Sequence, residues 1–214
     1  SVLSSLMQTG NIKKAILLAG DARKQAKEEL DQLFGYACTA TALEYSKEAK
    51  PFYFDLGTDG TGYDAIIRPG GGCRNQFNED SLKLELCEDG RKRHAIQTRM
   101  KGMDVFAFGI TTAPKSIKKL TANYEMDYTS FDYVILHQAN YKMTETIRKK
   151  LNLDAEKMPY SMLHFGNTSS ASIPLTIVTQ LKGKIEDKPT KIIGCAFGVG
   201  LSWGTVAFDD KAYS

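Results

Sequence analysis

The feature that most constrains the fold is the alternation of short apolar runs with helical segments in the second half of the chain. Apolar runs at 132–136 and 190–198 predict buried strands, and apolar residues at helical spacing predict helices at 140–151 and about 169–182. Strands that alternate with helices are typical of βαβ units, which build a parallel or mixed sheet. The sequence therefore predicts an α/β fold.

The first half of the chain is dominated by predicted strands. One is expected at 14–19, another from about 36 to 45, and two more, within 51–60 and 63–72, on either side of a Thr-Asp-Gly-Thr-Gly turn. The charged stretch 22–32 is compatible with a helix or with a polar loop.

A long helical segment follows these strands. Apolar residues recur at helical spacing from Met103 to about Leu120, and Pro114 in the middle predicts a kink or a break. The sequence also contains a weak internal repeat, because each half has an apolar strand followed by a strand rich in Gly, Ala and Thr. Such a repeat is compatible with a duplicated fold.

Composition excludes several classes of partner. The 214 residues are 42% hydrophobic and 25% charged, as in ordinary globular proteins, and the net charge of +3 is too small to predict nucleic-acid binding. No apolar run reaches the roughly 18 residues that suggest a membrane span, and no signal peptide is visible. Four cysteines without a CxxC pair and three histidines predict neither a metal site nor a disulfide framework, so we expect a cytoplasmic protein.

Three polar or glycine-rich stretches attract attention as a possible site: "HQAN" at a strand end, "HFGNTSSASIP", and the loop "FGVGLSWG". Together they offer the imidazole of His137, the amide of Asn167 and backbone N–H groups, which can stabilise a developing oxyanion or enolate. The carboxyl ends of strands are also where open α/β sheets place ligands. A nucleophile and a base partner are missing from this set.

Each stretch also has a purely structural interpretation. A lone histidine at a strand end is often a hydrogen-bonded structural residue, Asn167 could belong to a turn or a cap, and the glycines could only shape a hairpin. Cys38 and Cys195 lie within predicted strands and are interpreted as small buried hydrophobic residues.

The order of these stretches resembles the 3-oxoacyl-[acyl-carrier-protein] synthase III family of thiolase-fold condensing enzymes. The resemblance extends over most of the chain, because "GDARK", "LFGYACTATALEY", "DLGTDGTGYDAIIRPGGG" and "MKGMDVFAFG" are similar to further family segments. It implies a layered α-β-α-β-α fold. Residues 1–97 would be the remainder of the N-terminal half, and residues 98–214 the C-terminal half.

The resemblance also implies roles for individual residues. His137 and Asn167 take the positions of the family's catalytic His and Asn, while its nucleophilic Cys is absent, so that the chain looks truncated before Ser1 and inactive alone. Phe197, Gly198, Val199 and Gly200 would form the active-site loop with its oxyanion hole. A basic helix face would dock the acidic acyl carrier protein, through Lys142, Arg148, Lys149 and Lys150.

By this resemblance the complete protein is a homodimeric acyltransferase of fatty-acid or polyketide biosynthesis. It would condense an acyl thioester, usually acyl-CoA, with malonyl-acyl carrier protein, and would need no cofactor. The chain departs from the family pattern at Tyr36 to Cys38, at 27–32 and at Val199. These departures leave two alternatives open: a divergent acyltransferase that forms an ester or amide, and a non-catalytic subunit.

Overall fold

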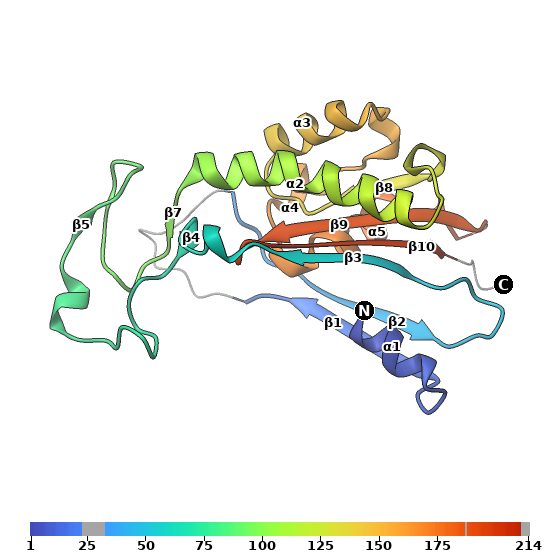
Figure 1. Ribbon diagram of the computed structural model, residues 1–214, viewed down its shortest axis with the longest axis horizontal. Helices are drawn as coiled ribbons and strands as arrows, with labels where there is room; N and C mark the ends of the chain where they lie inside the picture. The colour runs from blue at the N-terminus through green and yellow to red at the C-terminus, as the bar shows by residue number, and fades with distance from the viewer. Residues whose placement is uncertain (23–32, 187, 211–214) are drawn as a thin grey trace.

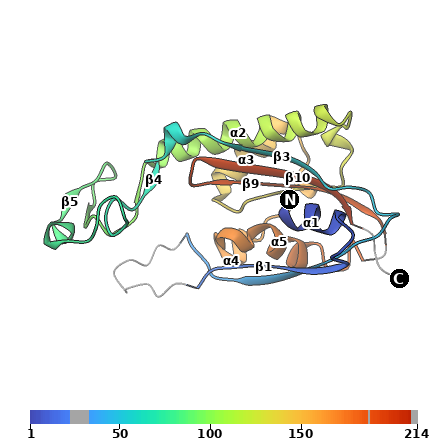
Figure 2. The same ribbon diagram turned by 60° about the horizontal axis from the view of Figure 1, so that its bottom comes forward.

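The computed structural model describes residues 1–22, 33–186 and 188–210 and has a layered α/β architecture (Figures 1 and 2). A four-stranded sheet carries α2 and α3 on one face. On its other face lie α1, α4 and α5, and beyond these helices lies the two-stranded sheet β1–β2 (Figure 2). The helices are α1 Val2–Gln8, α2 Gly102–Asn123, α3 Tyr141–Leu151, α4 Met162–Phe165 and α5 Ser172–Gln180.

The four-stranded sheet has the order β3-β10-β9-β8. Strand β8 is parallel to β9, and the other two pairs are antiparallel. The strands of the two sheets are β1 Lys14–Gly20, β2 Cys38–Glu44, β3 Tyr53–Thr58, β8 Tyr133–Leu136, β9 Thr190–Gly198 and β10 Ser202–Asp210.

The apolar core lies on both faces of this sheet. Val134 and Leu136 of β8 belong to the cluster that α2 and α3 cover, whereas Ile135 belongs to the cluster that α5 covers. All three side chains are at most 1% exposed, because successive residues of a strand point to opposite faces and both faces are covered. The continuous apolar run that predicted this strand is therefore explained.

Between β3 and α2 the chain forms an arm that projects from the layers (Figure 1). It contains two small antiparallel pairs, and many of its side chains are exposed. The pairs consist of β4 Ile66–Ile67 with β7 Arg99–Met100, and β5 Glu85–Leu86 with β6 Lys92–Arg93. The strand predicted within 63–72 is thus wrong in extent, since only two of its residues pair.

The predicted α/β fold is confirmed, and most elements lie within a few residues of their predicted bounds. Four of the five predicted layers occur among the described residues. The predicted division of the chain at residue 97 stays a prediction. Strand β3 precedes residue 97 in the sequence but pairs with β10, which follows it. The predicted helix 169–182 begins as a 3-10 turn, Ser169–Ala171, and the charged stretch 22–32 lies outside the described residues except for Ala22.

The interpretation of Cys38 as buried is wrong. Cys38 opens β2 and is exposed, because the exposed and half-buried residues of β2 alternate and Cys38 belongs to the exposed set. Within the described part of the chain, no helix covers that outer face of β1–β2, where Ile16 and Leu18 are also exposed. Cys195 is fully buried, as predicted. In the same described residues, no helix is both long and apolar enough to cross a membrane.

The predicted break at Pro114 does not occur, since α2 continues through it to Asn123. Proline has no N–H to donate to the carbonyl four residues earlier, which here belongs to Ile110. Lys150 of α3 donates to that carbonyl from Nζ, at 3.0 Å. The side chain of one helix therefore supplies the hydrogen bond that proline removes from the other.

This contact predicts a coupling between Lys150 and Pro114. Lys150→Met should lower the free energy of unfolding by about 1 kcal/mol, the net worth of one hydrogen bond. In a Pro114→Ala background the same change should cost less, because the N–H of residue 114 then bonds the Ile110 carbonyl. Urea unfolding of the four proteins of the double-mutant cycle measures the coupling. Lys149→Met, at an exposed neighbour, is the control, and equal losses from Lys150→Met in both backgrounds would contradict the account.

Candidate active site

His137 follows directly on β8, at the carboxyl end of the strand. Its N–H donates to the carbonyl of Cys195 at 2.8 Å, which extends the pairing between β8 and β9 by one step. Its ring meets the ring of Phe197 edge to face, with the centroids 5.9 Å apart. Because residues alternate along a strand, His137 is directed to the same face as Ile135, toward α5.

Asn167 lies in the loop between α4 and α5 and is held by the segment that leads into β2. Its N–H donates to the Leu33 carbonyl at 2.8 Å, and its own carbonyl accepts from the N–H of Gly35 at 2.9 Å. A side chain at Gly35 would bring its Cβ to 1.7 Å from the carbonyl oxygen of Phe165, so only glycine permits this approach. Asn167 is 8% exposed.

The side chain of Asn167 is also oriented. Its Oδ1 accepts from the N–H of Ser169 at 2.9 Å, whereas its Nδ2 donates to no group among the described residues. Ser169 has a φ of 52°, in the left-handed region, which costs a non-glycine residue about 1–2 kcal/mol. The left-handed backbone of Ser169, which orients the amide of Asn167, therefore forms despite its unfavourable conformational energy.

Hydrogen bonds connect the two predicted catalytic side chains through the start of α5. The Nδ1 of His137 lies 3.1 Å from the Oγ of Ser172, and that Oγ donates to the carbonyl of Ser169 at 2.7 Å. Ser169 in turn donates to Asn167. His137 and Asn167, 30 residues apart in the sequence, thus belong to one hydrogen-bonded site, with Nε2 of the ring and Nδ2 of the amide unpartnered among the described residues.

The predicted loop after β9 borders this site through Phe197. Gly198 ends β9, Val199 is 62% exposed, and Gly200 leads into the start of β10. The loop is fixed from outside by two backbone hydrogen bonds between Leu201 and Asp59, at 2.7 and 2.8 Å. Of this loop, Phe197 contacts the ring of His137, and the role of the loop as an oxyanion hole stays a prediction.

Gln138 and Ser172 were not predicted as functional residues. Gln138 is fully buried, and its Oε1 accepts from the N–H groups of Ser161 and Met162 at 3.1 and 3.2 Å. It thereby ties the end of β8 to the segment that leads to Asn167. Both residues lie within the motifs quoted above. A sequence motif does not show which of its polar side chains will be buried in the site.

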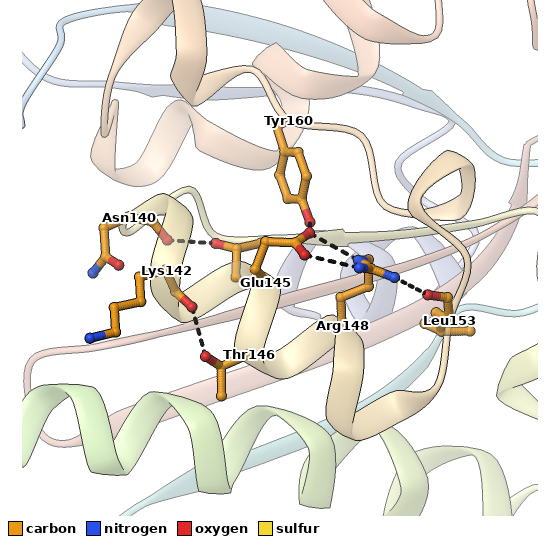
Figure 3. A network of polar contacts seen from close by, with 8 residues as sticks. Asn140, Lys142, Glu145, Thr146, Arg148, Leu153 and Tyr160 are labelled. Atoms are coloured by element: carbon orange, nitrogen blue, oxygen red, sulfur yellow. Dashed lines mark hydrogen bonds and ion pairs between the residues drawn. The ribbon is translucent and has the colours of Figure 1, made fainter.

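The four predicted docking residues of α3 differ in their environments, and Figure 3 shows two of them, Lys142 and Arg148. Arg148 donates to both carboxylate oxygens of Glu145 at 2.9 Å and to the Leu153 carbonyl at 2.6 Å, and Glu145 also accepts from the hydroxyl of Tyr160. Lys150 bonds the Ile110 carbonyl. Lys142 and Lys149 are exposed, and the Nζ of Lys142 lies 5.8 Å from the ring centroid of Phe106. Docking by these residues stays a prediction.

None of the four cysteines is arranged as a nucleophile beside this site. The Sγ of Cys195 accepts from the hydroxyl of Thr205 at 3.2 Å, and burial raises the pKa of this thiol to about 12. Cys38 is exposed at the start of β2, and Cys73 and Cys87 lie in the arm. No cluster of three or more His, Cys, Asp or Glu side chains forms a metal site in the described ranges.

The chain is similar in sequence to a known family of proteins. Residues 121–209 match the family described as 3-oxoacyl-[acyl-carrier-protein] synthase III C terminal. Beta-ketoacyl-[acyl-carrier-protein] synthase III of Clostridium acetobutylicum is 30% identical over 207 residues, covering 95% of this chain and 61% of that protein. The enzyme of the same name from Prochlorococcus marinus is 28% identical over 213 residues, covering 96% and 60%.

Solved structures give the same result. A crystal structure of 3-oxoacyl-(acyl-carrier-protein) synthase III has a TM-score of 0.88 at 28% identity, covering 97% of this chain and 64% of that chain. The 3-oxoacyl-(acyl-carrier protein) synthase of Burkholderia xenovorans has a TM-score of 0.81 at 32% identity, covering 96% and 58%. The predicted thiolase-like fold is confirmed, and the chain spans about three fifths of the length of the relatives that it matches.

The imidazole at the centre of the site is neutral at physiological pH. Burial lowers the pKa of His137 to about 4, from an ordinary value of 6.5. A protonated His137 therefore favours the unfolded state, in which the ring is hydrated. Stability that depends on the neutral ring is fully present above about pH 6.5 and is lost as the pH falls toward 4.

This shift predicts a pH dependence of unfolding. Between pH 8 and pH 4.5 the protein should lose about 2–3 kcal/mol of unfolding free energy through His137, at 1.36 kcal/mol per unit of pKa. His137→Asn should lose correspondingly less over the same interval, as measured by urea unfolding at each pH. If His137→Asn followed the parent protein across the whole interval, the neutral buried imidazole would be disproved.

Proposed function

Because the chain belongs to the 3-oxoacyl-[acyl-carrier-protein] synthase III family, we propose that it is part of a condensing enzyme. The proposed reaction joins an acyl thioester, such as acyl-CoA, to malonyl-acyl carrier protein by decarboxylative Claisen condensation, without a cofactor. The observation that carries the proposal is the hydrogen-bonded arrangement of His137 and Asn167, with the Nε2 and Nδ2 atoms left for a substrate.

In this proposal the two side chains act on the malonyl thioester. Loss of CO₂ leaves an enolate, whose charge lies largely on the thioester oxygen. Hydrogen bonds from Asn167 Nδ2 and from a protonated Nε2 of His137 stabilise that oxygen. The enolate carbon then attacks the acyl group, and the loop of Phe197, Gly198, Val199 and Gly200 would bind the second oxyanion.

The acyl group has to be carried by a nucleophile. A thiolate at a helix N-terminus suits this task, because a lowered pKa makes the thiolate available at neutral pH. Cys195 has the opposite properties, and the other three cysteines are not next to His137. We therefore assign the nucleophile to a cysteine outside the printed sequence.

This assignment predicts that the chain alone does not condense. The purified chain, mixed with acyl-CoA and malonyl-acyl carrier protein, should give no ketoacyl product by mass spectrometry. A longer protein that also supplies the nucleophilic cysteine should give it under the same conditions. A ketoacyl product from the chain alone would contradict the assignment, and a Cys195→Ala variant would then show whether Cys195 is the nucleophile after all.

Ester or amide formation on the same fold is the second candidate. One observation favours it: a neutral, largely buried imidazole can accept a proton from an alcohol or amine. The products separate the two reactions, because only condensation releases CO₂.

The acidic carrier protein would bind the exposed lysines of α3. Lys142, Lys149 and Lys150 are all exposed, but Arg148 and Lys150 already donate to backbone carbonyls, so Lys142 and Lys149 are the stronger candidates for this contact.

Charge reversal tests this docking surface. Lys142→Glu and Lys149→Glu should each slow association with malonyl-acyl carrier protein by about threefold to tenfold at low salt, and the difference should shrink as salt is added. Stopped-flow mixing or surface plasmon resonance measures the rate. Lys191→Glu, which reverses the charge of an exposed lysine near the start of β9, is the matched control. Unchanged association for both α3 variants would rule out docking on this face.

A further inference from the structure

The hydroxyl of Ser172 lies between the imidazole of His137 and the backbone of Ser169. Its Oγ is 3.1 Å from Nδ1 of His137 and 2.7 Å from the carbonyl oxygen of Ser169. Ser172 is 1% exposed, so bulk water does not compete for these contacts. The single hydroxyl proton of Ser172 can point either to Nδ1 of His137 or to the carbonyl oxygen of Ser169.

The position of this proton follows from the chemistry of the neighbours. A carbonyl oxygen only accepts, and two oxygens 2.7 Å apart require a proton between them, so the Ser172 hydroxyl donates to Ser169. That hydroxyl then has only lone pairs to offer His137. The 3.1 Å contact is a hydrogen bond only if Nδ1 of the ring carries the proton.

We infer that Ser172 is a positioning residue that holds His137 as its Nδ1–H tautomer. In a neutral imidazole one nitrogen is protonated and the other carries a lone pair, so Nε2 is the lone-pair atom at the open side of the ring. Among the described residues none hydrogen-bonds Nε2, and the aromatic neighbour of the ring is Phe197, which carries no titratable group.

The position of Ser172 is itself well fixed. It is the first residue of α5, its N–H donates to the Ser169 carbonyl, and its own carbonyl accepts from Thr176 Oγ1 at 2.8 Å. Thr176 Oγ1 lies 2.7 Å from the hydroxyl of Ser161, and the backbone N–H of Ser161 donates to Oε1 of Gln138. These contacts hold Ser172 in place, so the hydroxyl sets the tautomer of the ring rather than the reverse.

The inference deepens the proposed function and, for its catalytic meaning, rests on it. A resting His137 with its lone pair at Nε2 begins the reaction as a proton acceptor. It donates to a thioester oxygen only after Nε2 has taken up a proton, which the thiol of the nucleophilic cysteine would supply as it becomes the thiolate. The tautomer itself does not depend on which reaction the site catalyses, so it is measured without substrate.

Nitrogen NMR tests the tautomer directly. In the purified protein labelled with ¹⁵N-histidine, at pH 7.5, two-bond ¹H–¹⁵N correlations should show a protonated Nδ1 and an unprotonated Nε2 for His137. A His137→Asn variant assigns its signals among those of the three histidines. The reverse pattern, with the proton on Nε2, would overturn the inference whatever reaction the protein catalyses.

Two variants test the role of Ser172. Ser172→Ala should lose the Nδ1–H form as the dominant tautomer, whereas Ser172→Thr, which keeps the hydroxyl, should retain it. In the protein that carries the nucleophilic cysteine, Ser172→Ala should slow product formation by about tenfold or more, on the scale of the loss when the hydrogen-bond partner of a metal-bound histidine is removed.

Ser170→Ala, at an exposed neighbouring serine, should change neither the tautomer nor the rate. If Ser172→Ala kept the parent tautomer, Ser172 would not be the positioning residue. If the tautomer changed but the rate did not, the assignment of Ser172 would stand and the proposed role of His137 would fail.

Discussion

The site depends on the parallel pairing of β8 with β9 inside a sheet that is covered on both faces. Because Val134 and Leu136 are buried on one face and Ile135 on the other, a shift of one residue would move apolar side chains against the wrong helices. The register is therefore fixed, and with it the hydrogen bond from His137 to the Cys195 carbonyl. This bond places the imidazole against Phe197 and aims it at the start of α5.

A second constraint brings the amide to the imidazole. Asn167 is held through its backbone by Leu33 and Gly35, from the segment before β2, and through its side chain by Ser169. The contacts come from both halves of the chain, so the pair forms only when the two sheets are packed around α5. The resulting site contains an imidazole, an amide and hydroxyls, and burial lowers the pKa of its histidine. Such a site can stabilise charge that develops on a substrate oxygen.

Sequence patterns predicted the elements whose residues satisfy local rules, including β8, β9, α3 and the strand β1. They also identified His137 and Asn167, because these lie within motifs that resemble a known family. The failures had tertiary causes. Pro114 sits inside a continuous helix because Lys150, 36 residues later, satisfies the free carbonyl. The inward turn of Ser172 depends on the contacts of α5 with the rest of the site, which periodicity does not encode.

The central claim is that His137 and Asn167 together stabilise an enolate that forms from a malonyl thioester. The most direct test is the rate of CO₂ release from malonyl-acyl carrier protein, measured with the protein that carries the nucleophilic cysteine. The account predicts that His137→Ala and Asn167→Ala each reduce this rate by about a hundredfold, the usual loss when one oxyanion donor is removed. Undiminished CO₂ release from both variants would contradict it.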